Sequence, residues 1–449
     1  MSDSNEIDDI LKQIKKGGED KPLSDSGDIP GGNRSESECE PKQDGEIFEI
    51  SEQEAEVFRD FDLNDYVNEY AEDETDGAYA RIDKRKAVII AGIVLAVIAV
   101  AAAVVFTVYN NAKKEPETTV SSTAATTTTA APVVYKNPLT NKSDYSETAA
   151  DKRPVALVVE NAYDARPQWG IDDKENAPDI IVEGEVEGGE SRMLWLFADY
   201  TKLPKQVGPM RSARPPFIKF SELFDSIFIH WGQSSSKGDY IGADSVFRQD
   251  KVDHINQMTF NDSAGLFGRD KSRGVSTEHT GVLYGSKVSD AVESAGFRTE
   301  ANEKSYTKFD FNDTDKAVGE NVCSTMTVKF SSRTSSKNWS YNSADKMYHT
   351  SDFKTDVARK NLLVLFDTTE YVVKYNYGGS GRSETYCNYA LSGGNGKLAS
   401  LGTVTDITWS VENGVLVIKD ANGKTVNLNT GTTWIGYGSS NNGGSAVTG

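Results

Sequence analysis

Cysteine and histidine are scarce in this chain, and so are the motifs that depend on them. The 449 residues include three cysteines and four histidines, with no HExxH and no paired-cysteine spacing. We therefore expect no metal ion and no zinc enzyme. The glycine-rich fingerprints of nucleotide and dinucleotide binding are also missing from the sequence, so no cofactor is expected.

The three cysteines divide between two regions of the chain. Cys39 lies in the N-terminal tail, whereas Cys323 and Cys387 lie in the C-terminal part. The spacing of the latter two fits no metal motif. A disulfide between them in an oxidising exterior and a pair of free thiols are equal alternatives at this stage.

Positive charge is scarce in the first 80 residues, which hold 25 Asp and Glu against 7 Lys and Arg and so carry most of the net charge of −20. Such a segment buries too little apolar surface to offset chain entropy, which predicts a disordered acidic tail over residues 1–86. Phosphate would be repelled, so nucleic acid is not expected as a partner. Apolar residues within 4–16 and 46–70 indicate either segments that fold on a cytoplasmic partner protein or transient helices without one.

One long apolar run follows this tail. Residues 87–109 are 23 uncharged positions, and about 20 such residues cross the hydrocarbon core of a bilayer. Because the run begins after 86 mostly polar residues, we interpret it as a retained single-pass anchor and not as a cleaved signal peptide. The basic residues that flank it are Arg81, Lys84, Arg85 and Lys86 before the run, and Lys113 and Lys114 after it. This bias predicts a cytoplasmic N-terminus and extracytoplasmic C-terminal domains at the cell membrane.

The remaining residues predict an α+β protein outside the membrane. A Thr- and Ala-rich linker covers residues 110–135, a mixed α/β domain 136–310, a β-rich domain 311–438 and a disordered tail 439–449. In the mixed domain, apolar runs predict strands and amphipathic segments predict helices over 213–224 and 281–295. The strands expected from apolar or alternating runs cover residues 154–160, 179–187, 192–199, 226–231, 323–331, 361–367, 370–376, 405–411, 414–420, 424–429 and 432–437.

Arginines gather among glycines and prolines in residues 187–215, and another lies in 162–170, where simple packing would not require guanidinium groups. Arginine suits planar recognition of carboxylate or phosphate, which predicts an anion-binding cleft. Adjacent glycines permit close approach of the backbone to a ligand. The candidate ligand-binding residues are Arg166, Glu187, Gly188, Gly189, Arg192, Arg211, Ser212, Arg214 and His230.

A second interpretation treats the arginines of this block as internal struts. Arg192, Arg211 and Arg214 would then pair with acidic residues across a sheet. The candidate partners are Asp179, Glu183 and Glu187.

The histidines and serines supply the candidates for catalysis. His230 ends a predicted strand shortly before Gly232, and His279 precedes a predicted helix, so either could act as a general base. Ser212 or Ser234 would be the nucleophile, although no GxSxG or SxxK motif supports one. His254 and His349 have no partner that the sequence makes evident.

Five of the six tryptophans allow two roles, stacking on a sugar or peptide when exposed and filling a core when buried. Trp169 and Trp231 lie beside glycines near the candidate site, whereas Trp409 and Trp434 are expected in the core of the second domain. With Trp195, we expect three of the five in the core.

Several motifs resemble one bacterial family. NPLTN at Asn137, RPVALVVEN at Arg153, ARPQWG at Ala165, VEGGESRM at Val186 and VGPMRSARP at Val207 are similar to the ectodomain of the YerB-like lipoproteins, a family of undefined function. ITWSV from residue 407 and the run 423–437 resemble the family's second domain. Family members are held by an acylated cysteine, and here a transmembrane helix would replace it.

These observations predict a membrane-tethered binding or regulatory protein of a Gram-positive-type cell envelope. Its ligand would be an anionic cell-wall polymer or the carboxylates of an envelope protein. A wall-acting enzyme with a histidine base is the first alternative. An envelope scaffold whose acidic tail binds a cytoplasmic partner is the second.

Overall fold

A long mixed sheet organises the protein. The computed structural model describes residues 133–302, 306–375 and 381–449. The acidic tail, the apolar run 87–109 and nearly all of the linker lie outside these residues. Within the part of the chain that is described, no helix is both long enough and apolar enough to cross a membrane. All of the described residues belong to one compact unit.

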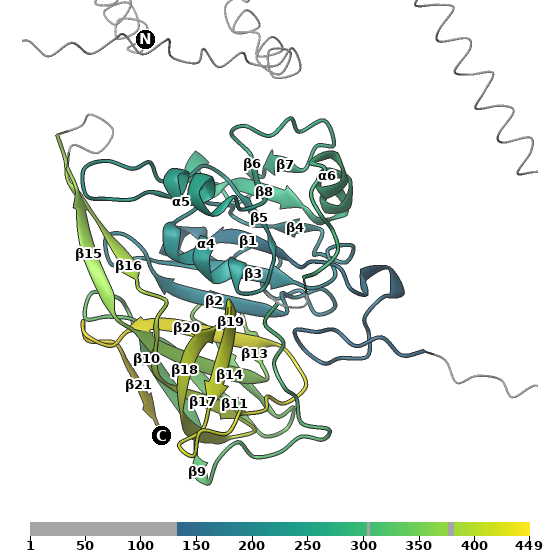
Figure 1. The fold of residues 1–449 in the computed structure, drawn as a ribbon, viewed down its shortest axis with the longest axis vertical. Helices are drawn as coiled ribbons and strands as arrows, with labels where there is room; N and C mark the ends of the chain where they lie inside the picture. The colour runs from purple at the N-terminus through teal and green to yellow at the C-terminus, as the bar shows by residue number, and fades with distance from the viewer. Residues whose placement is uncertain (1–132, 303–305, 376–380) are drawn as a thin grey trace, which may run out of the picture. The chain divides into compact units, whose positions relative to one another are not determined.

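The central sheet contains strands from both halves of the folded part (Figure 1). Its order is β19-β18-β17-β14-β20-β2-β3-β1-β5-β6, and β9 pairs with β18. The strands are β1 (Val155–Glu160), β2 (Ile180–Glu185), β3 (Ser191–Phe197), β5 (Ile227–His230), β6 (His254–Asn256), β9 (Asn321–Val322), β14 (Asn361–Asp367), β17 (Gly393–Ser400), β18 (Thr403–Glu412), β19 (Val415–Lys419) and β20 (Thr433–Ser439).

Strand β20 joins the two halves, because it pairs in parallel with β14 on one side and with β2 on the other. Trp434 is thereby aligned with both Leu362 and Ile181. Segments 136–310 and 311–438 therefore contribute to one continuous sheet.

The other strands form three smaller sheets. A five-stranded sheet has the order β13-β12-β11-β10-β21, a hairpin joins β15 to β16, and β4-β8-β7 form a third. Their bounds are β4 (Gln206–Val207), β7 (Phe267–Arg269), β8 (Gly281–Tyr284), β10 (Thr325–Lys329), β11 (Lys337–Asn342), β12 (Met347–Thr350), β13 (Val357–Arg359), β15 (Thr369–Lys374), β16 (Glu384–Tyr389) and β21 (Ser445–Thr448).

Helices are few and short among the described residues, so the fold is rich in β-structure. The α-helices are α4 (Pro215–Glu222), α5 (Ala243–Asp250) and α6 (Val288–Ser294), and the 3-10 turns are η1 (Glu147–Ala149), η2 (Tyr163–Ala165), η3 (Thr277–His279) and η4 (Gly285–Lys287). Helices α4 and α5 contact each other beside β5 (Figure 1). The three α-helices of the described residues lie in the segment 136–310, and the sequence pattern predicts α4 and α6 but not α5.

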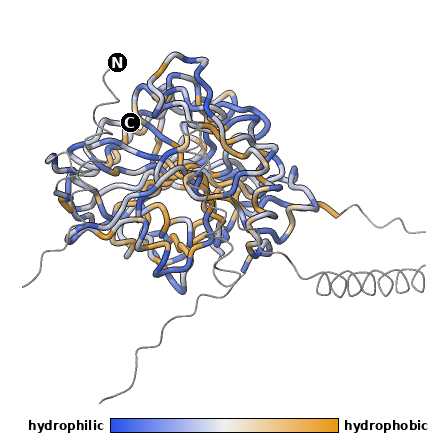
Figure 2. The backbone as a smooth tube through the Cα atoms, turned by 90° about the horizontal axis from the view of Figure 1, so that it is seen from above, coloured by the Kyte–Doolittle hydropathy of each residue, from blue (hydrophilic) through white to orange (hydrophobic). Residues whose placement is uncertain are grey.

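Apolar side chains pack on both faces of the central sheet, because alternate residues of a strand point to opposite sides. Ala156 and Val158 of β1 pack in the core that includes α4, whereas Leu157 and Val159 pack in the core that includes the five-stranded sheet. Every residue of β1 is buried as a result. Figure 2 shows apolar segments running through the interior and polar segments around it. This two-sided burial explains why continuous apolar runs identify these strands.

Two local predictions are wrong. The expected helix 281–295 begins with β8, because residues 281–284 pair with β7 and β4, and α6 starts only at Val288. The expected strand 424–429 makes only isolated bridges, at Thr425 and at Leu428. There the carboxylate of Asp420 accepts the backbone N–H of Lys424 and holds the chain in a turn.

The prediction that residues 439–449 form a disordered tail is also wrong. Residues 445–448 form β21, which pairs antiparallel with β10, and Ala446 packs against the core. The side chain of Asn442 donates to the carbonyl of Thr369. Backbone pairing therefore orders a segment whose polar composition indicates no packing.

Deletion of residues 440–449 should consequently destabilise the fold. The deletion removes the hydrogen bonds between β10 and β21, each of which contributes about 1 kcal/mol, so we expect a loss of roughly 2–4 kcal/mol. Urea unfolding of residues 126–449 and of the shortened fragment measures it. An unchanged unfolding midpoint would contradict the observed pairing.

Both described cysteines are free and buried. Cys323 packs in the core cluster on one side of the central sheet and Cys387 in the cluster on the other. The structure thus favours the free-thiol alternative. Burial raises the pKa of the Cys387 thiol to about 12, which makes this thiol unreactive at neutral pH.

Candidate functional site

The candidate site forms where several strand ends meet. Strands β1, β5 and β6 run parallel, so their carboxyl ends, near Glu160, His230 and Asn256, lie along one edge of the sheet. Strand β3 runs antiparallel to β1 and begins at this edge, where Arg192 is aligned with Glu160. Ligands of open α/β sheets bind outside the carboxyl ends of parallel strands.

The arginine-rich segment 207–214 is fixed across these strand ends by its backbone. Arg211 donates its N–H to the carbonyl of Val158 and accepts at its own carbonyl from the N–H of Trp231. Met210 donates its N–H to the carbonyl of Gly281. The segment therefore lies between β1 and β5 and presents its side chains along the edge.

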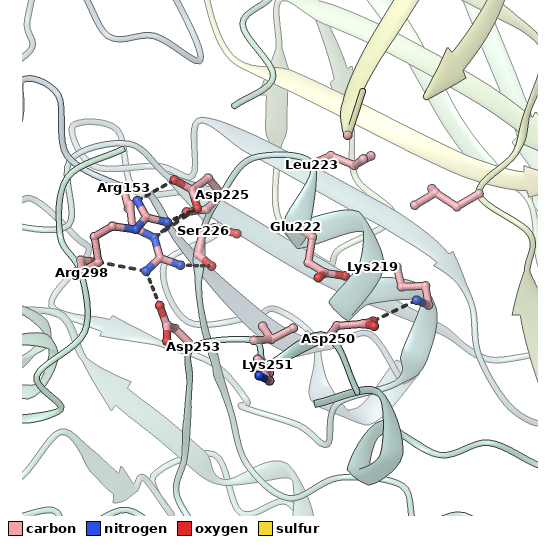
Figure 3. Close-up of a pocket in the computed structure, with 13 residues that line it drawn as sticks. Arg153, Lys219, Glu222, Leu223, Asp225, Ser226, Asp250, Lys251, Asp253 and Arg298 are labelled. Carbon is pink, nitrogen blue, oxygen red and sulfur yellow. Dashed lines mark hydrogen bonds and ion pairs between the residues drawn. The ribbon is translucent and has the colours of Figure 1, made fainter. Parts of the chain in front are cut away.

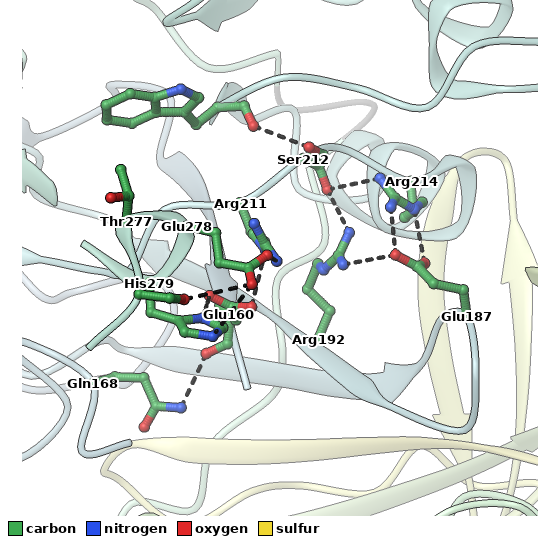
Figure 4. A network of polar contacts seen from close by, with 12 residues as sticks. Glu160, Gln168, Glu187, Arg192, Arg211, Ser212, Arg214, Thr277, Glu278 and His279 are labelled. Carbon is green, nitrogen blue, oxygen red and sulfur yellow. Dashed lines mark hydrogen bonds and ion pairs between the residues drawn. The ribbon is translucent and has the colours of Figure 1, made fainter. Parts of the chain in front are cut away.

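Arg192 of β3 and Arg214 of this segment form a buried inner cluster with Glu187 (Figure 4). Arg192 Nη2 lies 3.0 Å from Glu187 Oε1, Arg214 Nε lies 2.9 Å from Oε2, and Arg214 Nη2 also contacts Oε1. Arg192 and Arg214 are 7% and 8% exposed. Burial alone would raise the pKa of Glu187, but the two guanidinium groups outweigh it and hold the pKa at about 2.

The ion pairs of this cluster hold the fold together from within, which agrees with the second interpretation of the arginines. Arg192 Nη1 donates to the carbonyl of Ser212 at 2.8 Å, and Arg214 Nη1 to that of Ala213 at 3.0 Å. The cluster thereby fixes the backbone beside Arg211. Of the other proposed acidic partners, Asp179 accepts from Asn137 and Glu183 lies beside Lys337, so neither serves these arginines.

A second, outer cluster centres on Arg211 (Figure 4). Arg211 Nε lies 2.9 Å from Glu160 Oε1, and Nη2 lies 2.8 Å from Glu278 Oε2. His279 Nδ1 contacts the remaining oxygen of Glu160 at 2.9 Å. The Glu160 carboxylate is buried, whereas the Glu278 side chain is 57% exposed. The hydrogen bond from Arg211 is the largest cause of the lowered pKa of Glu278.

A cleft of about 570 Å³ opens beside the outer cluster. Arg211, Ser212 and Glu278 lie on its wall together with Trp231, Asn256 and Arg269. The guanidinium of Arg269 sits over the ring of Trp231, 4.6 Å from the ring centre, which is a cation–π contact. The cleft thus offers two cations, one aromatic ring and several hydrogen-bonding groups.

The other predicted ligand-binding residues lie elsewhere. Gly188 and Gly189 have positive φ, and a Cβ at Gly189 would lie 2.7 Å from the carbonyl oxygen of Arg333, so the close approach is to the protein's own backbone. Arg166 donates to the carbonyl and side-chain oxygens of Asn161. None of these residues lines the cleft.

His230 is buried and cannot act as the proposed base from this position. Its Nδ1 contacts the carbonyl of Gly232 at 2.7 Å, and its Nε2 faces Nδ1 of His254 at 2.9 Å. Burial lowers the pKa of His230 to about 3. His254 therefore has a partner after all, as does His349, which contacts Asp345 and Asp356.

The candidate serines have no histidine among the partners that the structure shows. The hydroxyl of Ser212 donates to the carbonyl of Trp231, and Ser234 accepts from the hydroxyl of Tyr240. Among the described residues, no group of His, Cys, Asp and Glu is arranged to hold a metal ion.

The tryptophans divide by burial. Trp195, Trp409 and Trp434 are at most 3% exposed and lie in the core. Trp169 and Trp231 are partly exposed near the site, and Arg273 sits 3.5 Å from the ring centre of Trp169. The sequence singles out Trp231 but not Glu160, Asn256, Arg269 or Glu278. Glu160 is a polar residue at the end of an otherwise apolar strand, and this pattern could have identified the strand ends where the site lies.

Another cavity, of about 470 Å³, lies at the opposite edge of the sheet (Figure 3). Arg153, Ser226 and Asp253 around it precede β1, β5 and β6. Most of its charged groups pair with one another, as Arg298 does with Asp225 and Lys219 with Asp250, each at 2.9 Å. We therefore place the candidate site at the cleft beside Arg211.

Comparisons with known proteins identify relatives of the whole folded part. Residues 139–298 match a family model described as the N-terminal domain of a protein of unknown function, DUF3048, and residues 326–435 match the DUF3048 C-terminal domain. The chain is 30% identical over 311 residues to the lipoprotein YerB of Bacillus subtilis (strain 168), covering 67% of this chain and 85% of YerB. The crystal structure of YerB from Bacillus subtilis aligns with a TM-score of 0.55 and 25% identity, over 70% of this chain and 100% of that one.

Proposed function

The chain belongs to the YerB-like DUF3048 family, and from this premise we propose that it is an extracytoplasmic binding or regulatory protein of the bacterial cell envelope, which recognises an anionic wall component at the cleft beside Arg211. The family relationship supports the location, because the relative is described as a lipoprotein. In this chain the apolar residues 87–109 would anchor the protein in place of a lipid, with the N-terminus in the cytoplasm.

The observation that carries the proposal is the state of Arg211. Its guanidinium lies on the cleft wall, and one of its two carboxylate partners, Glu278, is exposed and belongs to a short 3-10 turn. A ligand carboxylate or phosphate can replace Glu278 with the same charge-assisted geometry. Glu160 keeps the guanidinium oriented throughout, because it is buried and bound on its other oxygen by His279.

The ring of Trp231 and the second cation, Arg269, complete the recognition surface. An aromatic face beside two guanidinium groups suits a ligand that combines a sugar or peptide plane with a negative charge. Anionic wall polymers and the peptides of peptidoglycan have this chemistry. This reasoning favours a wall component over a partner protein as the ligand.

Binding to wall fractions tests the proposed function. Residues 126–449 would be incubated with purified peptidoglycan, with an anionic wall polymer and with an uncharged glucan as control. We expect saturable binding to one charged fraction that weakens as salt is raised. Equal retention by the uncharged glucan, or no retention by any fraction, would contradict the proposal.

Glu278→Gln should strengthen binding of the anionic ligand. The variant removes the carboxylate that competes for Arg211 and keeps a side chain of the same size. Because an exposed ion pair contributes about 0.2–1 kcal/mol, we expect an increase in affinity of roughly two- to fivefold. Glu293→Gln, the same change at an exposed position on α6 outside the cleft, serves as control. A weaker or unchanged affinity of Glu278→Gln would argue that Glu278 itself binds the ligand.

One observation favours an enzyme as second candidate. The pair of His279 and Glu160 resembles an imidazole oriented by a carboxylate, and it lies next to Arg211, which could stabilise negative charge in a transition state. In this version His279 is the base and not His230. Mass spectrometry of wall fragments incubated with wild type and with His279→Gln would decide, since an enzyme gives a product that the variant does not. The scaffold version rests on the acidic tail and stays a prediction.

A further inference from the structure

A lysine, an asparagine and a glutamate meet in the interior behind the candidate site. Lys337 begins β11, Asn161 directly follows β1, and Glu183 belongs to β2. They are 4%, 0% and 1% exposed, and none of them lines the cleft. Burying three such polar groups in an apolar interior is costly unless each is fully hydrogen-bonded, so their burial together calls for an explanation such as a reaction between them.

Glu183 contacts both nitrogen atoms of this group. Its Oε1 accepts a hydrogen bond from Asn161 Nδ2 at 2.6 Å and lies 3.4 Å from Lys337 Nζ. The two nitrogens therefore lie no farther apart than the sum of these distances. The carboxylate is held in place by Trp434 Nε1, which donates to Oε2 at 3.1 Å, and by Ser191 Oγ, which donates to Oε1 at 3.0 Å.

The amide carbonyl of Asn161 is held by two donors. Arg166 Nε donates to Oδ1 at 3.1 Å and Gln168 Nε2 donates to it at 2.9 Å. A guanidinium and an amide N–H on one carbonyl oxygen polarise the carbon and stabilise negative charge that develops on the oxygen. The same contacts leave Nδ2 on the side of Glu183.

Lys337 is poorly solvated for a charged group. Among the described residues, Glu183 supplies the carboxylate that lies within ion-pair distance of Lys337 Nζ. The centre of the Phe353 ring lies 3.9 Å from the same nitrogen. Burial lowers the pKa of the Lys337 amine, with Glu183 opposing the shift. A buried lysine that loses its proton more readily is a stronger nucleophile.

We propose that Lys337 and Asn161 condense to an intramolecular isopeptide bond, with Glu183 as the proton carrier. The Lys337 Nζ lone pair attacks Asn161 Cγ and forms a new carbon–nitrogen bond, while Arg166 and Gln168 stabilise the charge on Oδ1. Glu183 accepts a proton from Nζ and delivers it to Nδ2. The bond between Cγ and Nδ2 then breaks, and one ammonia leaves. No oxidant, reductant or cofactor takes part.

The bond would connect the central sheet to the five-stranded sheet, since Asn161 follows β1 and Lys337 begins β11. It would close a covalent loop over residues 161–337 and so restrict the unfolded chain. A fold held outside the cell without a disulfide would gain from such a link. This inference does not depend on what the cleft binds.

Mass spectrometry of the full chain under denaturing conditions tests the proposal directly. We expect the wild-type mass to be lower than the sequence mass by one ammonia. Succinimide formation at any of the four Asn-Gly pairs, which begin at Asn395, Asn413, Asn422 and Asn442, would cause the same loss. The deciding observation is therefore a protease digest, in which the peptide with Asn161 must be joined to the peptide with Lys337.

Two variants identify the chemistry. Lys337→Met keeps an apolar stem and removes the nucleophile, so the joined peptide should be absent. Glu183→Gln keeps both reacting groups and removes the proton carrier, and it should also give separate peptides. Should Glu183→Gln fail to fold, the wild-type digest still decides. Recovery of Asn161 and Lys337 in separate, unmodified peptides from folded wild-type protein would overturn the proposal.

Discussion

Glu187→Gln should lower the free energy of unfolding by about 3–5 kcal/mol, because removing one partner of a buried ion pair leaves uncompensated charge in the interior. Arg192 and Arg214 would lie side by side without a carboxylate at 3.0 Å or less. Urea unfolding of residues 126–449 measures the change. Glu190→Gln, an exposed position in the same turn, is the matched control and should change stability by less than about 0.5 kcal/mol.

The pH dependence of the wild type gives an independent check. The folded pKa of Glu187 is about 2, below its usual 4.5, so its carboxylate stabilises the fold above about pH 4.5. This contribution, about 3 kcal/mol from the size of the shift, is lost as pH falls from about 4.5 towards 2. The difference between wild type and Glu187→Gln should therefore shrink over this interval. A constant difference would contradict the assigned cause.

Arg211→Ala should weaken binding of the anionic ligand at least about 30-fold, since truncating one partner of a hydrogen-bonded charge pair costs about 2–5 kcal/mol. Arg211→Lys keeps a cation beside Glu160 and provides a second folded variant. We expect it to bind roughly tenfold more weakly than wild type, because an ammonium group cannot pair bidentately with a carboxylate or phosphate. Arg248→Ala on α5, whose side chain is 70% exposed outside the cleft, is the matched control.

The strands were predictable where both faces of the sheet are covered by the core. The run 154–160 reads as a strand because its residues face apolar cores on both sides of the sheet, and β1 has this position. The parallel pairing of β20 with both β2 and β14 was not predictable. β20 lies about 250 residues from β2 and about 70 residues from β14 in the sequence, and no local pattern encodes such contacts.

The residues of the candidate cleft were predictable only in small part: of the predicted ligand-binding residues, Arg211 and Ser212 line it, and Arg269, Asn256 and Glu278 were not singled out. The arginines of residues 187–215 do converge at one sheet edge, as their unusual context indicates. Which of them faces the cleft depends on register, because Arg192 at the start of β3 points to Glu187 whereas Arg211 reaches Glu160. His230 was misassigned, since a strand-end histidine next to a glycine looks accessible in sequence and is covered here by Phe247.

The most direct test of the account is the equilibrium binding of residues 126–449, as wild type and as Arg211→Ala, to purified anionic wall polymer. The proposed recognition site predicts saturable binding by the wild type and loss of that binding in a variant with unchanged circular dichroism. Equal binding by the folded variant would show that Arg211 does not contact the ligand. It would contradict the central claim that the cleft at the ends of β1, β5 and β6 recognises an anionic envelope component.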